Sequence, residues 1–192
     1  MVDLILASRS PRRCDLLNRI GIVFETDAPD VDETCDLPAP DAVRVLSCRK
    51  ASACASSHPG RFILAADTLV SLDGSSLGKP EDEKRAADML RQLSGRTHQV
   101  YTGVTVISPG GTVFTEVDCT DVTFALLTDD EIESYVRSGE PMDKAGAYAL
   151  QGRASMWIEH IDGSDTSVIG LPLYLVRRLL NRAGFPIRQE TD

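Results

Sequence analysis

Two adjacent arginines stand at the start of an expected helix, where cationic side chains are electrostatically unfavourable. Ser10 followed by a proline is typical of an N-cap with proline at the first helical position, so Arg12 and Arg13 fall in the first turn. The helix macrodipole favours anions at that end. Backbone N–H groups, the hydroxyls of Ser8 and Ser10 and two guanidinium groups would together bind a phosphate group. Alternatively, the arginines are solvated or pair with acidic neighbours such as Asp15.

Carboxylates in two other segments are candidates for binding a metal ion or water. Asp67 follows the apolar run 62–66, so we expect its carboxylate to emerge at a strand end, the usual place for ligand-binding groups in open α/β sheets. Glu33 lies in an acidic loop beside Asp30 and Asp32. Hard oxygen ligands together with substrate phosphates are what Mg²⁺ or Mn²⁺ requires. A turn cap at Asp67 and a merely solvated acidic loop are the alternatives.

Two lysines could bring positive charge to the same site. Lys79 stands in a Gly-Lys-Pro turn before an expected helix, and Lys50 lies on a helix face of otherwise small residues. Either could be an ordinary surface lysine, and for Lys50 taken alone this is the simpler interpretation.

Other catalytic chemistries lack support in the sequence. The histidines, His58, His98 and His160, do not stand in a recognisable nucleophile context, and a Walker loop and a G-x-G-x-x-G motif are absent. The five cysteines are an odd number without a C-x-x-C pair, which favours reduced, structural thiols. Because the histidines are far apart in the sequence, a zinc site built on His and Cys is not expected.

Apolar runs alternate with amphipathic segments, and this order predicts the framework that positions these side chains. Strands are expected over 4–7, 22–26, 62–66, 99–107, 112–126 and 156–161, and helices over 10–20, 41–57, 80–93, 128–139 and 172–182. Strands alternating with helices indicate an α/β sheet, and a hairpin turn at 108–111 makes that sheet mixed rather than all-parallel. At 192 residues and 42% apolar content, one domain spanning 1–192 is the default.

Charge and hydropathy restrict the partners. A net charge of -9 disfavours extended contacts with nucleic acid or an anionic membrane, although a small anion could still bind a local basic pocket. No run approaches the roughly 20 apolar residues that cross a bilayer, and residues 1–10 lack the pattern of a signal peptide. We therefore expect a cytoplasmic protein without membrane or nucleic-acid partners.

Seven short motifs, taken together and in order, resemble the Maf family, also called septum-formation-inhibitor proteins. They lie at 8–17 (S-R-S-P-R-R-C-D-L-L), 66–68 (A-D-T), 77–80 (L-G-K-P), 93–95 (L-S-G), 101–104 (Y-T-G-V), 144–152 (K-A-G-A-Y-A-L-Q-G) and 168–173 (V-I-G-L-P-L). The resemblance implies an elongated, mixed central sheet flanked by helices, with two lobes around a deep cleft, similar to inosine triphosphatases. It also implies a house-cleaning nucleoside triphosphate pyrophosphatase that depends on a divalent cation, Mg²⁺ or Mn²⁺, and that acts as a homodimer in similar proteins.

The resemblance also implies a role for each candidate residue. Asp67 looks like the catalytic acidic residue and, with Glu33, a metal ligand, while Lys50 and Lys79 neutralise developing charge. The remaining substrate-binding positions are Ser8, Ser10, Arg12, Arg13, Thr68 and Gln151. Of these, Arg12, Thr68 and Gln151 match positions that set nucleobase choice, and they look like the dTTP/UTP branch of the family.

Two departures from the family pattern are present, and the second would alter the rim of the cleft and so the substrate range. Asp15 replaces the usual Glu after the arginines, and 163–166 (G-S-D-T) lacks the usual aromatic residue. The alternatives are a pyrophosphatase for 7-methyl-GTP or another modified nucleotide, and a nucleotide-sensing regulator of cell division without turnover.

Overall fold

A single mixed sheet runs the length of the molecule in the computed structural model, which describes residues 3–187; the predicted domain, 1–192, extends beyond these at both ends. Within the described residues the sheet has seven strands in the order β2-β1-β3-β5-β6-β7, and β4 pairs with β3. The strands are β1 (Leu4–Leu6), β2 (Glu25–Thr26), β3 (Phe62–Leu72), β4 (Ser75–Leu77), β5 (Thr97–Ile107), β6 (Val113–Phe124) and β7 (Ile158–Asp162). Strand β1 is parallel to β2 and β3, and the other pairs are antiparallel, so the predicted mixed α/β fold is confirmed.

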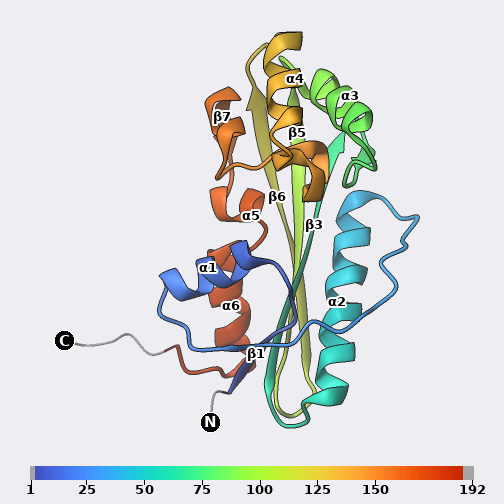
Figure 1. The fold of residues 1–192 in the computed structure, drawn as a ribbon. Coiled ribbons are helices and arrows are strands. Elements are labelled where there is room, and N and C mark those ends of the chain that lie inside the picture. The colour runs from blue at the N-terminus through green and yellow to red at the C-terminus, as the bar shows by residue number, and fades with distance from the viewer. Residues whose placement is uncertain (1–2, 188–192) are drawn as a thin grey trace, which may run out of the picture.

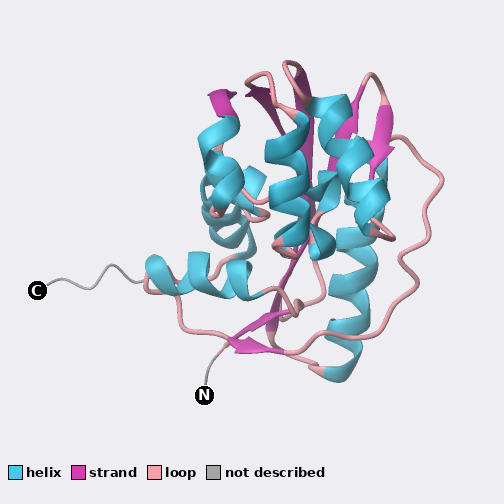
Figure 2. Cartoon of the chain, turned by 45° about the horizontal axis from the view of Figure 1, so that its top comes forward, coloured by secondary structure: helices cyan, strands magenta, loops and turns pink. Residues whose placement is uncertain are grey.

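Helices cover both faces of this sheet (Figure 1). They are α1 (Pro11–Arg19), α2 (Ala39–Ser57), α3 (Glu83–Leu93), α4 (Asp129–Arg137), α5 (Asp165–Ile169) and α6 (Leu173–Ala183). Three 3-10 helices, η1 (Glu140–Asp143), η2 (Ala145–Ala147) and η3 (Arg153–Trp157), follow α4. Helix α2 lies along one face, α1, α5 and α6 lie on the other, and α3 and α4 pack together at one end, as the tilted view of Figure 2 also shows.

Most predicted elements exist, and their boundaries shift for local reasons. The T-x-x-E capping box at Thr128 is present, with reciprocal hydrogen bonds between Thr128 and Glu131. The predicted start of the third helix at 80 is wrong, because the Asp82 carboxylate accepts a hydrogen bond from the Arg85 N–H and caps the helix there. The strand predicted over 22–26 is reduced to Glu25–Thr26.

Strand β3 does not end before Asp67, and this corrects the sequence-based expectation. It continues to Leu72 because β5 pairs antiparallel with it from Ile63 to Ser71. On its other edge, β1 pairs with Phe62–Leu64 and β4 with Val70–Leu72. Residues 65–69 lie between these two paired stretches, so Asp67 is a mid-strand residue beside a gap in the sheet.

Side chains alternate between the two faces along β3 and β5, and the faces differ in character. On the α2 face, Ile63 and Ala65 pack with Ala51 and Cys54 of that helix. The opposite face carries two apolar clusters that meet at a polar pair, Thr68 and Thr102, whose hydroxyls are 2.9 Å apart.

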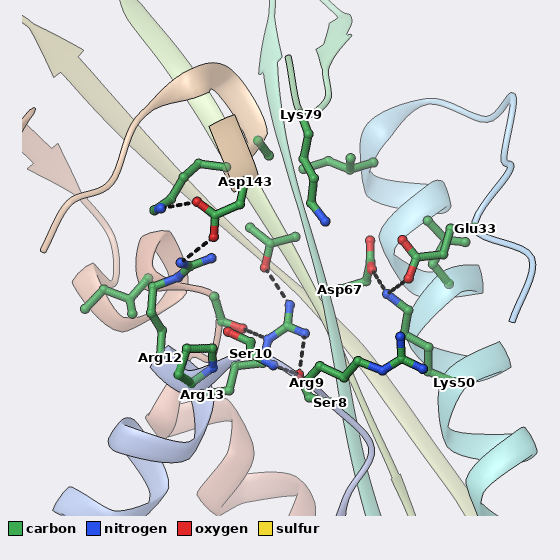
Figure 3. Close-up of a pocket in the computed structure, with 18 of the residues that line it drawn as sticks. Ser8, Arg9, Ser10, Arg12, Arg13, Glu33, Lys50, Asp67, Lys79 and Asp143 are labelled. Carbon is green, nitrogen blue, oxygen red and sulfur yellow. Dashed lines mark hydrogen bonds and ion pairs between the residues drawn. The ribbon is translucent and has the colours of Figure 1, made fainter. Parts of the chain in front are cut away.

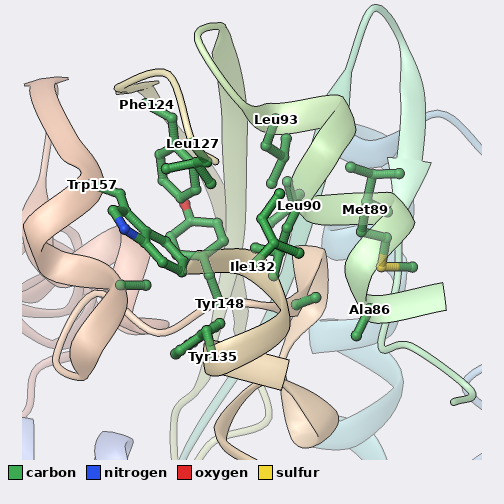
Figure 4. Close-up of a cluster of buried hydrophobic side chains, with 14 of the residues drawn as sticks. Ala86, Met89, Leu90, Leu93, Phe124, Leu127, Ile132, Tyr135, Tyr148 and Trp157 are labelled. Carbon is green, nitrogen blue, oxygen red and sulfur yellow. The ribbon is translucent and has the colours of Figure 1, made fainter. Parts of the chain in front are cut away.

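The two clusters on that face occupy opposite ends of the sheet. One packs β1, β3 and β5 against α1 and α6, through residues that include Leu6, Leu17, Leu64 and Leu179. The other packs the far ends of β3, β5 and β6 against α3 and α4 and contains Leu90, Ile132, Tyr148 and Trp157 (Figure 4).

A glycine allows α2 to approach the sheet directly opposite Asp67. Gly103 of β5 is the register partner of Asp67, and a Cβ at this position would lie 2.3 Å from the Val43 carbonyl oxygen of α2. Any side chain would push the helix away, so glycine holds α2 against the sheet at this level.

His98 links the second cluster to the segment that follows η2. Its Nε2 lies 2.8 Å from the Tyr148 hydroxyl, and its ring meets Phe124 edge-on with centroids 5.1 Å apart. Burial lowers the pKa of His98 to about 4, although the charge of Asp121 acts against this shift.

Among the described residues, no helix combines the length and apolarity that crossing a membrane requires.

Acidification is expected to destabilise the protein through His98. Because its pKa is lowered from 6.5 to about 4 on folding, the unfolded chain binds more protons between these values. The free energy of unfolding should therefore fall as the pH drops through 6.5 toward 4, by on the order of 3 kcal/mol from this group.

Urea denaturation of wild type and His98→Gln across pH 7 to 4 tests this expectation, because the comparison removes the contribution of the carboxylates. The wild type should lose stability relative to the variant as the pH falls. A difference that stays constant over this range would show that His98 does not titrate as expected.

Candidate active site

A cleft of about 630 Å³ opens where the edge of β3 lies between β1 and β4. Its walls come from the β1–α1 junction, the loop after β2, α2, β3, the turn after β4, the 3-10 helical segment and the end of α5. The structure brings all ten predicted site residues to this cleft: Ser8, Ser10, Arg12, Arg13, Glu33, Lys50, Asp67, Thr68, Lys79 and Gln151. Arg13 and Asp67, which come from different layers of the fold, therefore face one space.

Lys50 bridges the two carboxylates that the sequence predicts as metal ligands (Figure 3). Its Nζ lies 2.6 Å from Asp67 Oδ1 and 2.9 Å from Glu33 Oε1. The side chains of Lys50 and Asp67 are only 14% and 11% exposed, so each charge has a partner where water is scarce. The reading of Lys50 as an ordinary surface lysine is therefore wrong.

Glu33 is held in its ionised form by the surrounding cations. Burial raises its pKa, but the hydrogen bond from Lys50 and the charges of Lys50, Lys79 and Arg13 outweigh this effect, and the pKa is lowered overall. Glu33 itself is largely exposed, near the middle of the loop 27–38 between β2 and α2, which contains no strand or helix. Its position therefore depends on Lys50 of α2.

Arg13 joins three segments of the chain on the other face of the sheet. Its Nε donates to the Gly170 carbonyl at 2.8 Å, and its two terminal nitrogens donate to the hydroxyls of Ser8 at 3.2 Å and Thr68 at 3.4 Å. Burial lowers the pKa of Arg13 from its ordinary value, and Asp67 and Glu33 act against this shift. Because five N–H donors form a rigid planar fork, a guanidinium can hold these positions and still face a ligand.

Gly170 suits this position because of its backbone conformation. Its φ of 119° is in the region that favours glycine, whereas a Cβ there would make only van der Waals contacts, at 3.4 Å with Thr68 Oγ1 and 3.6 Å with Arg13 Nε.

Arg12 lies at the rim of the cleft and pairs with Asp143 at 3.5 Å. Asp143 also pairs with Lys144, whose Nζ donates to the Glu140 carbonyl at 3.0 Å. Gln151 is exposed on the same rim, at the end of the segment 148–151 that lines the cleft. The side chains of Arg12 and Gln151 can therefore adjust to a ligand more freely than Arg13 can.

Positive charge is concentrated in this cleft, although the chain as a whole is acidic. Of the described lining residues, six are cationic (Arg9, Arg12, Arg13, Lys50, Lys79 and Lys144) and four are carboxylates (Asp30, Glu33, Asp67 and Asp143). Against a net charge of -9, this local surplus favours a compact polyanion over an extended one.

Two lining residues, Asp143 and Lys144, and one buried residue behind the cleft, Thr102, were not given a role from the sequence. Thr102 supports Thr68 and donates to the Ser167 carbonyl at 3.0 Å, so it connects the site to α5. Asp143 and Lys144 follow α4, and only the K-A-G-A-Y motif signalled that segment. The signal for Thr102 was its place at the centre of an apolar strand, where a hydroxyl needs a partner.

A second cluster of potential ligands lies outside the lining of the cleft. Asp27, Cys54 and His58 offer one ligand atom each, all within 4.8 Å of one another. The separation of the histidines along the chain predicts no metal site built on His and Cys, but the fold brings Cys54 and His58 together with Asp27.

Two Ham1 proteins are among the solved structures with a similar fold. The Ham1 protein of Staphylococcus aureus superposes with a TM-score of 0.55 over 93% of this chain and 98% of its own, at 15% identity. A HAM1 protein from Coxiella burnetii gives 0.53 over 95% and 100%, also at 15% identity. At this identity the likeness defines the fold class alone.

Sequence comparison is more specific than the fold. The family described as Maf-like protein matches residues 3–183, and the chain belongs to this family. A protein of Symbiobacterium thermophilum named dTTP/UTP pyrophosphatase is 47% identical over 97% of both chains. One of the same name from Myxococcus xanthus is 48% identical over 96% of this chain and 94% of its own.

Replacing Arg13 with lysine should destabilise the protein by at least about 1 kcal/mol, because a lysine cannot reproduce three donors in one plane and hydrogen bonds to charged groups stabilise by roughly 1.5–3 kcal/mol each. The matched change Arg12→Lys, at the rim, should alter the free energy of unfolding by no more than about 0.5 kcal/mol. Chemical denaturation of both variants provides the measurement, and equal losses would contradict the anchoring role of Arg13.

Proposed function

We propose that this protein hydrolyses dTTP and UTP to the nucleoside monophosphate and pyrophosphate. The single observation that carries the proposal is that Arg13 and the Lys50–Asp67 pair, from opposite faces of the sheet, line one cleft with a cationic surplus. A triphosphate is a compact polyanion that matches such a site. The names of relatives at 47–48% identity over nearly the whole chain support the same reaction and substrates.

The donor set at Glu33 and Asp67 fits a hard divalent cation. Two carboxylates with substrate phosphates and water are typical ligands of Mg²⁺ and Mn²⁺. Glu33 and Asp67 would hold the cation, and Lys50 contacts one oxygen of each of these carboxylates. When bound, it would neutralise phosphate charge and lower the pKa of a bound water.

The chain's own residues bind the triphosphate and orient or deprotonate the attacking water. Arg13, Lys79 and Lys50 neutralise charge that develops on the triphosphate, aided by Ser8 and Ser10 at the start of α1. Asp67 orients or deprotonates the attacking water. Attack forms a bond from this oxygen to the α-phosphorus and breaks the bond to the bridging oxygen, so pyrophosphate leaves.

Selection of the nucleobase depends on Gln151, Thr68 and Arg12. The Gln151 amide both donates and accepts, which suits the O4 and N3 edge of uracil or thymine. Thr68 is less free, because its hydroxyl is already bonded to Arg13 and Thr102. We therefore place most of the base discrimination on Gln151.

Replacing Asp67 with asparagine should lower the turnover of dTTP by at least about 100-fold, because the amide cannot accept the proton of water. Pyrophosphate release measured with Mg²⁺ and with Mn²⁺ provides the test. Circular dichroism and thermal unfolding check that the variant is folded. Lys50 still has Glu33 as an ion-pair partner in this variant, so its charge is not left unpaired. Turnover close to that of the wild type would reject the role of Asp67.

Replacing Gln151 with glutamate should reduce the preference for dTTP and UTP over purine triphosphates, because a carboxylate offers no donor to the O4 atom. The ratio of kcat/KM values across a panel that includes 7-methyl-GTP measures this preference. Since Gln151 is exposed, stability should stay within about 0.5 kcal/mol of the wild type. An unchanged ratio would remove Gln151 from base selection.

Tight nucleotide binding without pyrophosphate release in that panel would favour the alternative, a non-catalytic regulator. The homodimer and the single domain over 1–192 remain part of the proposal.

A further inference from the structure

Three side chains with different ligand chemistry meet at the C-terminal end of α2. Asp27 follows β2, Cys54 is in the last turn of α2, and His58 is the residue after this helix. His58 Nε2 lies 2.7 Å from Asp27 Oδ2, and Cys54 Sγ lies 3.9 Å from the Asp27 carbonyl oxygen. No role in the proposed reaction requires any of these three groups.

The backbone holds the cluster together from both sides. The Asp27 N–H donates to the Leu6 carbonyl at 3.2 Å, which attaches this residue to the end of β1. Cys54 and His58 are four residues apart, so a helical turn places them on one side of α2. The His58 N–H still bonds to the Cys54 carbonyl at 3.1 Å, which limits the position of the imidazole.

We propose that Asp27, Cys54 and His58 bind a borderline-soft divalent cation of the Zn²⁺ class, at a site separate from the one that serves catalysis. A thiolate, an imidazole and a carboxylate are zinc ligands, and water would complete four-coordination. With metal–ligand bonds of about 2.0–2.3 Å, tetrahedral geometry needs ligand atoms roughly 3.3–3.7 Å apart. The present separations, from 2.7 Å between His58 and Asp27 to no more than 4.8 Å within the cluster, bracket that spacing.

The two sites differ in the ions they suit. The catalytic pair offers carboxylate oxygens alone, beside an ammonium group, and favours hard cations. The second cluster has a fully buried sulfur and a half-buried imidazole. Burial, followed by the charge of Asp27, raises the pKa of Cys54 to about 11, so metal binding must displace a proton from the thiol.

Binding there would connect the two elements that position the catalytic carboxylates. Asp27 begins the loop that carries Glu33, and Cys54 lies one turn after Lys50, which pairs with Glu33. A metal bound between Asp27 and α2 would fix the start of this loop, in addition to the Glu33–Lys50 pair that holds its middle. The expected role is therefore to order the Glu33 loop, without contact with the reacting atoms.

Cobalt titration without nucleotide tests the proposal, because Co²⁺ takes the same geometry as Zn²⁺ and reports a thiolate ligand by a charge-transfer band in the near ultraviolet. The wild type should show this band with one equivalent of Co²⁺, and excess Zn²⁺ should abolish it. Cys54→Ser should lack the band, and the matched variant Cys119→Ser, at an exposed cysteine, should keep it.

His58→Gln is a second test in case Cys54→Ser does not fold, because the His58 side chain is partly exposed and its replacement should disturb the fold less. It should weaken Zn²⁺ binding at least about tenfold, the effect that loss of even an outer-shell partner has. Zn²⁺ should raise the Tm of wild type and Cys119→Ser and leave that of Cys54→Ser unchanged. A band that persists in Cys54→Ser, or its absence from the wild type, would overturn the site.

The outcome is independent of the pyrophosphatase proposal. Asp67→Asn should retain the cobalt band and the Zn²⁺ affinity although it loses turnover. Loss of both properties in that variant would instead mean that the metal binds in the cleft, and would also reject the separate site.

Discussion

The candidate site depends on one constraint, which is that β3 is longer than either of its neighbours on one edge. Strand β1 pairs only with Phe62–Leu64 and β4 only with Val70–Leu72, whereas β5 pairs with β3 throughout. The interval between β1 and β4 gives side chains from other segments access to the middle of a buried strand. The chain that leaves β1 lines this interval with the start of α1, which carries Arg12 and Arg13, and the loop after β2 lines it with Glu33.

Alternation along β3 then divides the site between the two faces of the sheet. Asp67 faces α2 and pairs with Lys50, and the next residue, Thr68, faces the opposite way and accepts from Arg13. A buried charge is costly unless it is paired, so each face supplies its own polar partners. Only at an open edge can groups from both faces share one ligand, which is why the cleft opens there.

The same polar position also divides the hydrophobic core. Along β5, Val104 and Val106 belong to the cluster under α6, Val100 belongs to the cluster under α3 and α4, and Thr102 lies between them. Hydroxyls at that level satisfy each other and the backbone of α5, so the polar band costs little. The cleft thus follows from an interruption of the core that the strands themselves encode.

The sequence by itself determined the α/β class, the mixed sheet and most element types, because apolar periodicity, caps and turn residues act over a few positions. It also identified Arg13 and Asp67, since a cation in the first turn of a helix and a carboxylate directly after an apolar run each need an unusual partner. Only the tertiary structure decided that Lys50 joins Asp67 to Glu33, that Asp67 lies within β3, and that Asp27, Cys54 and His58 meet. These outcomes depend on which strands pair and how far they extend, and such long-range pairings leave no periodic signal in the chain.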